Sequence, residues 1–97
     1  MTEKNLDLNI AIALEIIREL PNTFDSHDFI KKYAKQNEIQ YIHELYSYGS
    51  FRTYHLQIGK ELLRLSENGA LPIIKIMETK SEDVFGNIDE IAKWRKK

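Results

Sequence analysis

The histidine and acidic residues of the chain are the first candidates for chemistry. His43 and Glu44 begin the His-Glu-x-x-His pattern of a helical zinc site, but position 47 is serine, so the second imidazole is missing. His27 and His55 are not spaced to add ligands, and no third or fourth donor converges with them. The sequence contains no cysteine, which excludes disulfides, thiolate metal sites and cysteine nucleophiles. We therefore expect no metal site.

Residues 25–28 bring together two aspartates, a serine and a histidine, which are residue types used in acid–base catalysis. The same types are typical of a helix N-terminus, where their side chains accept hydrogen bonds from the first backbone amides. Capping explains them without a further assumption. No serine lies in a nucleophile elbow, and no glycine-rich loop precedes a helix. We expect that the protein is not an enzyme and needs no cofactor, and no small-molecule substrate is evident.

A polar strip within residues 51–67 is a candidate for nucleic-acid binding, because its members recur about once per helical turn. Hydroxyl and amide groups can contact base edges, whereas lysine and arginine can hold phosphates. Glu61 and Glu67 flank the strip, so an ordinary solvated helix face is the alternative. The strip consists of Thr53, Gln57, Lys60 and Arg64, and Arg52 can add positive charge nearby; these five are the expected DNA-binding residues.

Half of the aromatic residues lie within residues 41–54, which indicates either a layer of the core or an interaction surface. The last segment carries the single tryptophan on a narrow apolar edge. Such an edge must be buried against the domain itself or against a second copy. The expected interface residues of a possible homodimer are Tyr41, Tyr46, Tyr48 and Trp94.

These residues require helices to position them, and local signals predict several. Apolar spacing predicts a helix over 10–20 that Pro21 ends, and another over 51–67 between Ser50 and Asn68-Gly69. Residues 26–48 form either one long helix or two, because Asn37 resembles a fresh cap while the apolar spacing continues past it.

After Gly69 the spacing of the apolar residues changes from that of a helix to that of a strand. Residues 73–77 read as a strand and 84–85 as a short returning strand, which makes a small β hairpin. Asn87, with Glu90 three residues on and basic residues at the far end, predicts a C-terminal helix over 87–97. On the helix 51–67, Leu56 and Leu63 flank Gly59, where another element can cross closely.

Composition limits the class of protein. The 97 residues with 42% hydrophobic and 30% charged side chains predict a single globular domain spanning 1–97. The 14 basic and 15 acidic residues leave a net charge of −1, so any attraction to nucleic acid must be local. No apolar run approaches the length of a membrane span and no signal peptide is evident, so we expect no membrane partner and a cytoplasmic location.

The order of these elements resembles a winged helix-turn-helix domain over residues 8–85, and thus implies an α+β, mainly helical fold with three or four helices. In that family the helix before the hairpin enters the DNA major groove, and the hairpin forms the wing. Residues 37–49 are longer than the family's usual turn, and Glu82 and Asp83 make the presumed wing acidic. Two functions are therefore expected as alternatives: a small DNA-binding regulator, or a protein-interaction and dimerisation module without a nucleic-acid role.

Overall fold

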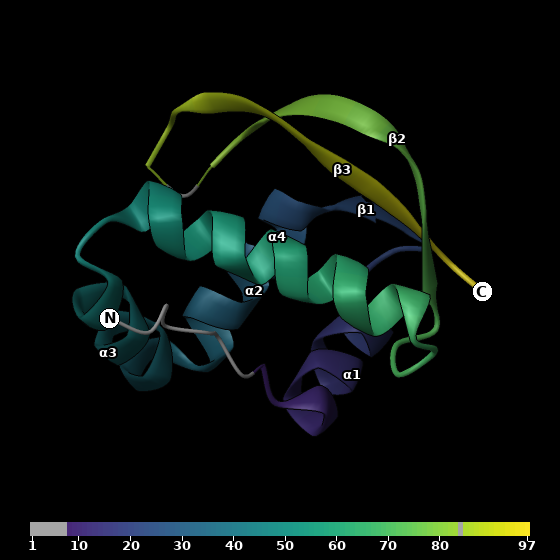
Figure 1. The fold of residues 1–97 in the computed structure, drawn as a ribbon, viewed down its shortest axis with the longest axis horizontal. Helices are drawn as coiled ribbons and strands as arrows, with labels where there is room; N and C mark the ends of the chain where they lie inside the picture. Colours follow the sequence, from purple (N-terminus) through teal and green to yellow (C-terminus); the bar gives the residue numbers. More distant parts are fainter. Residues whose placement is uncertain (1–7, 84) are drawn as a thin grey trace.

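A computed structural model describes residues 8–83 and 85–97 of the chain (Figure 1). Four helices and three antiparallel strands make up the described part, so the prediction of a mainly helical α+β fold is confirmed. In chain order they are α1 (Ile10–Glu19), β1 (Thr23–Asp25), α2 (Ser26–Gln36), α3 (Glu38–Tyr48), α4 (Phe51–Glu67), β2 (Ile73–Glu82) and β3 (Ile88–Lys96).

Short-range capping sets the starts of three helices. The Asn9 side chain accepts a hydrogen bond from the backbone N–H of Ile12 at the start of α1. Asp25 and Asp28 form a reciprocal capping box on α2, with N–O distances of 2.8 and 3.0 Å. Ser50 caps α4. The acidic residues of segment 25–28 therefore serve the helix terminus.

Residues 26–48 form two helices. Asn37 lies between them with φ −129° and ψ 50°, outside helical geometry. Its N–H still donates to the Tyr33 carbonyl, and its own carbonyl accepts from Tyr41, both at 2.8 Å. The break changes the direction of the chain while it keeps these backbone groups bonded.

The three strands form one sheet in the order β1-β3-β2, so the last strand is the central one. Phe24 pairs with Trp94 on one side, and Ile73 pairs with Lys96 on the other. The β2–β3 hairpin is much longer than the predicted strand 73–77. The predicted return at 84–85 is wrong, because Phe85 lies in the turn and Val84 lies outside the described residues.

The predicted C-terminal helix over 87–97 is wrong, because Ile88–Lys96 is strand β3. Its residues are good helix formers, but propensity is a weak prior that tertiary pairing overrides. Strand geometry lets this segment pair with β1 and β2 at once. It also turns Trp94 inward, where the indole is fully buried and its Nε1–H donates to Ser26 Oγ at 3.0 Å.

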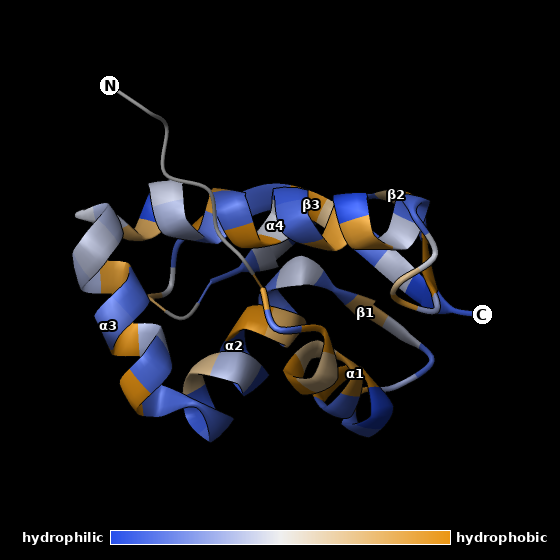
Figure 2. Ribbon diagram, turned by 60° about the horizontal axis from the view of Figure 1, so that its bottom comes forward, coloured by the Kyte–Doolittle hydropathy of each residue, from blue (hydrophilic) through white to orange (hydrophobic). Residues whose placement is uncertain are grey.

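The hydrophobic core lies between the helices and the root of the hairpin. Figure 2 shows the hydrophobic residues of α1, α2 and α4 turned toward the space between them. The outer half of the hairpin leaves this core and arches along α4 (Figure 1). The largest fully buried side chains include Trp94, Tyr54, Phe24, Phe29, Ile58, Leu62, Leu71 and Ile73.

The position of Trp94 gives a first prediction. Trp94→Ala should lower the free energy of unfolding by about 3–5 kcal/mol, since it removes a fully buried aromatic side chain and leaves a cavity. Urea unfolding followed by circular dichroism measures the change. Ile88→Ala on the same strand is the control, because Ile88 is 64% exposed. Equal effects of the two substitutions would contradict the buried position of Trp94.

Candidate nucleic-acid interface and the groove beside it

Helix α4 presents three faces. Tyr54, Ile58 and Leu62 are fully buried and form the face that packs on the core. A second face carries polar side chains to solvent, and a third carries Leu56 and Leu63 toward the β2–β3 hairpin. The helix therefore separates a polar surface from an apolar one.

The polar strip predicted from the sequence is present on α4. Thr53, Gln57, Lys60 and Arg64 fall within an arc of about 60° around the helix axis, and Gln57 is the half-buried member. The Arg64 guanidinium is bonded to the largely buried carboxylate of Glu61, one turn earlier on α4. This pairing fixes the position of the Arg64 side chain.

Arg52, the remaining expected DNA-binding residue, points toward the hairpin. Its guanidinium forms an ion pair with Asp89 of β3 at 3.5 Å, and it lines the space between α4 and the hairpin. Arg52 therefore does not lie beside the other four expected DNA-binding residues. The pair attaches the first turn of α4 to the returning strand.

The predicted interface residues fall into two groups. Tyr41 is 6% exposed and Trp94 is fully buried, so both belong to the core and cannot form the expected dimer surface. Tyr48 is half-buried and stacks on Tyr54 with ring centroids 5.5 Å apart. Tyr46 is 88% exposed on α3. The aromatic cluster is thus mainly a core layer, with Tyr46 on its outside.

A shared carboxylate joins three helices inside this aromatic layer. Glu44 of α3 accepts hydrogen bonds from Tyr33 of α2 at 2.9 Å and from Tyr54 of α4 at 2.5 Å. Burial, followed by the hydrogen bond to Glu44, raises the pKa of both tyrosines above the ordinary value. The hydroxyls stay protonated and act as donors, so the network is a structural one.

The tip of the hairpin is also attached to α4. Phe85 packs on Phe51 with ring centroids 4.7 Å apart and lies nearly parallel to His55 at 6.1 Å. Asp83 shapes the turn, because its carboxylate accepts the backbone N–H groups of Phe85 and Asn87, both at 2.9 Å. Burial raises the pKa of Asp83, but these bonds, the Asn87 side chain and the nearby His27 lower it by more.

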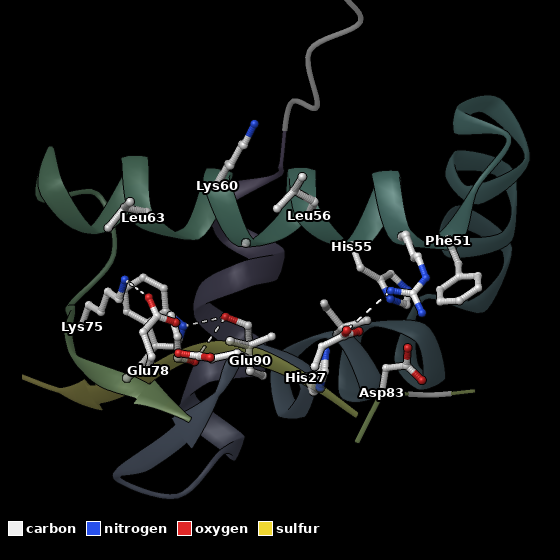
Figure 3. Close-up of a pocket in the computed structure, with 18 residues that line it drawn as sticks. His27, Phe51, His55, Leu56, Lys60, Leu63, Lys75, Glu78, Asp83 and Glu90 are labelled. Carbon is white, nitrogen blue, oxygen red and sulfur yellow. Dashed lines mark hydrogen bonds and ion pairs between the residues drawn. The ribbon is translucent and has the colours of Figure 1, made fainter. Parts of the chain in front are cut away.

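A groove of about 480 Å³ lies between α4 and the hairpin (Figure 3). Leu56, Gly59 and Leu63 line it from α4, while Ile91 and Trp94 line it from β3. The sequence predicts that another element crosses α4 closely near Leu56, Gly59 and Leu63. That prediction identifies the wall on α4 but not the groove itself. The opposite wall comes from a strand that sequence reasoning took for a helix.

Two buried histidines lie at one end of the groove. His27 is 4% exposed, and its Nδ1 has no hydrogen-bond partner among the described residues. His55 is 8% exposed, and its Nε2 lies 2.6 Å from the Tyr41 hydroxyl. Burial raises the pKa of Tyr41 to about 12, with a further contribution from Asp83. No local signal in the sequence indicates the burial of His27.

The described residues offer no cluster of three histidine, aspartate or glutamate side chains that could hold a metal ion. None of the helices in residues 8–83 and 85–97 has the length and apolar character needed to span a bilayer. No protein-family model, curated protein or solved structure matches the chain.

The burial of His55 predicts a loss of stability in mild acid. Burial, opposed by Asp83 and reinforced by His27, lowers the pKa of His55 to about 4 in the folded protein. In the unfolded chain the pKa returns to about 6.5. Between these values the unfolded state binds one proton that the folded state does not bind. Stability should therefore fall as the pH falls from 6.5 to 4, by up to about 1.4 kcal/mol per pH unit.

Urea unfolding between pH 6.5 and 5 tests this dependence above the range where Asp83 titrates. His55→Gln removes the titrating group, so its stability should vary less with pH than that of the wild type. His43→Gln is the matched control, because His43 is exposed on α3. A His55→Gln protein with the wild-type slope would show that another group causes the acid sensitivity.

Proposed function

We propose that the chain is a DNA-binding protein of the winged-helix type, with α4 as the recognition helix. The observation that carries the proposal is the long hairpin that follows α4 and flanks it (Figure 1), while Thr53, Lys60 and Arg64 of the polar strip are exposed on α4. The order of elements and the sheet order β1-β3-β2 support it as well. One fold can serve several functions, so the proposed DNA binding depends on the side chains of the strip.

The strip has the chemistry that groove binding requires. Lys60 and Arg64 would contact phosphates, whereas Thr53 and Gln57 would contact base edges in the major groove. The ion pair with Glu61 holds Arg64 in one orientation, and a guanidinium has five N–H donors, so it can bind a carboxylate and a phosphate together. The net charge of −1 supplies no general attraction, so these side chains must provide it.

Salt dependence of DNA binding tests the proposal. Lys60→Ala and Arg64→Ala should each weaken binding to all duplexes and reduce the slope of log K against log salt concentration by about one. Fluorescence anisotropy with a labelled duplex, measured at several salt concentrations, gives both values. Lys35→Ala removes an exposed lysine from α2 and should leave the slope unchanged.

Gln57→Ala has a different expected effect, since an amide contributes no charge. It should reduce discrimination between duplex sequences by about 1–3 kcal/mol at one base pair and leave the salt slope intact. If the wild type binds duplex DNA at low salt no better than the Lys60→Ala, Arg64→Ala double variant, α4 is a solvated face and the DNA proposal is wrong.

A second candidate function is self-association through α3, and a specific observation favours it. Ile39, Ile42 and Tyr46 recur along one side of α3 and are 86%, 55% and 88% exposed. A two-fold axis between positions 42 and 43 would place Ile39 of one copy on Tyr46 of the other. The stripe is thus self-complementary, as a two-fold dimer interface must be.

Sedimentation equilibrium tests self-association directly. The wild type should show dimers of twice 11.4 kDa as its concentration rises, and Ile42→Glu should shift the protein toward monomer. Met77→Glu is the matched control, since Met77 on β2 is 55% exposed like Ile42. Monomeric wild type at millimolar concentration would exclude the dimer, and equal effects of both variants would place the interface elsewhere.

A further inference from the structure

The hairpin is fixed to α4 at both ends and bows away from it in between. At the root, Ser66 Oγ donates to the Ile73 carbonyl at 2.7 Å, and the Leu71 N–H donates to the Leu65 carbonyl at 3.0 Å. At the tip, Phe85 packs on α4 and the Arg52–Asp89 pair joins the two elements. These two attachments fix the distance between α4 and the hairpin, and thus the size of the space between them.

The walls of this groove are largely apolar. Leu56 is 58% exposed and Leu63 is 38% exposed, both on the side of α4 that faces the hairpin (Figure 3). Between them lies Gly59, where an added Cβ would meet no heavy atom within 4 Å. Ile91 of β3 lines the opposite side. A volume of about 480 Å³ falls within the range of small-molecule pockets.

Most charged groups of the lining are already engaged within the protein. Arg52 pairs with Asp89, and Lys75 pairs with Glu78 at 2.5 Å. The Lys60 ammonium points away from the groove in Figure 3. Glu90 adds an exposed carboxylate on β3, which disfavours an anionic occupant. The groove therefore suits a neutral molecule.

One buried polar atom in the lining lacks a partner. His27 Nδ1 has no hydrogen bond within residues 8–83 and 85–97, although the ring is 4% exposed. An unsatisfied buried polar atom is costly, so a ligand group that bonds to it gains affinity. A hydroxyl group can donate or accept, so it fits either tautomer of the imidazole.

We infer that the groove between α4 and the β2–β3 hairpin binds a small neutral molecule with an apolar, ring-sized body and a hydroxyl group that hydrogen-bonds to His27 Nδ1. The body would lie between Leu56 and Leu63 on one side and Ile91 of β3 on the other. The inference does not depend on DNA binding, because Lys60 is the only member of the polar strip in the groove lining and its ammonium points away from the groove (Figure 3).

Titration of the ¹⁵N-labelled chain with 2-naphthol tests the site. Trp94 is the single tryptophan, so its indole N–H gives one NMR signal, and that N–H is bonded to Ser26 in the groove lining. The signal should shift in a saturable way. Naphthalene, which lacks the hydroxyl, should bind about 3- to 10-fold more weakly, as expected for the loss of one hydrogen bond.

Gly59→Leu is the decisive variant, because it fills the groove while it improves helix propensity. It should fold at least as stably as the wild type and lose 2-naphthol binding at least 10-fold. Lys35→Leu, at an exposed position of α2 outside the groove lining, is the control and should bind normally. His27→Phe should abolish the difference between 2-naphthol and naphthalene.

Several outcomes would overturn the inference. A Trp94 signal that does not move, or a Gly59→Leu protein that binds like the wild type, would show that the groove is not the site. Equal affinities of the wild type for 2-naphthol and naphthalene would exclude the bond to His27. A Trp94 signal that shifts with protein concentration alone would mean that a second copy of the chain fills the groove.

Discussion

The insertion of β3 between β1 and β2 is the constraint on which the remaining structure depends. Trp94 links this strand to the helices through full burial and through its bond to Ser26, 68 residues earlier in the chain. The Ser26 hydroxyl in turn donates to the Ala92 carbonyl at 3.4 Å. Because β3 is central, its position determines where β2 lies, and β2 determines how the hairpin runs along α4. The groove between α4 and the hairpin therefore follows from this one pairing.

The elements that sequence reasoning predicted correctly are those with short-range causes. The bounds of α4 were predictable because Ser50 and the Asn68-Gly69 pair act on residues three or four positions away. The strand β3 was not predictable in this way. Asn87, Glu90 and the basic end favour a helix locally, whereas β1 and β2 lie about 70 and 15 residues away. Long-range pairing prevailed over a local preference.

The same distinction explains which site residues were predictable. The strip of Thr53, Gln57, Lys60 and Arg64 depends only on helical periodicity, so the sequence was sufficient to find it. The orientation of Arg52 was not predictable, because it depends on Asp89, which the sequence assigned to a different element. The groove and the burial of His27 need two walls from distant segments, and no periodicity within one segment reveals them.

The attachment of the hairpin tip decides how the proposed DNA complex can be built. Phe85 holds the tip on the first turns of α4, so the hairpin is not extended as a separate arm. The acidic turn is also less repulsive than its sequence suggests, because the Asp83 carboxylate is directed into the turn and compensated by two backbone N–H groups. Glu82 remains exposed on the hairpin. DNA contacts would therefore come mainly from the open face of α4, and the hairpin would act chiefly by holding that helix in place and by closing the groove behind it.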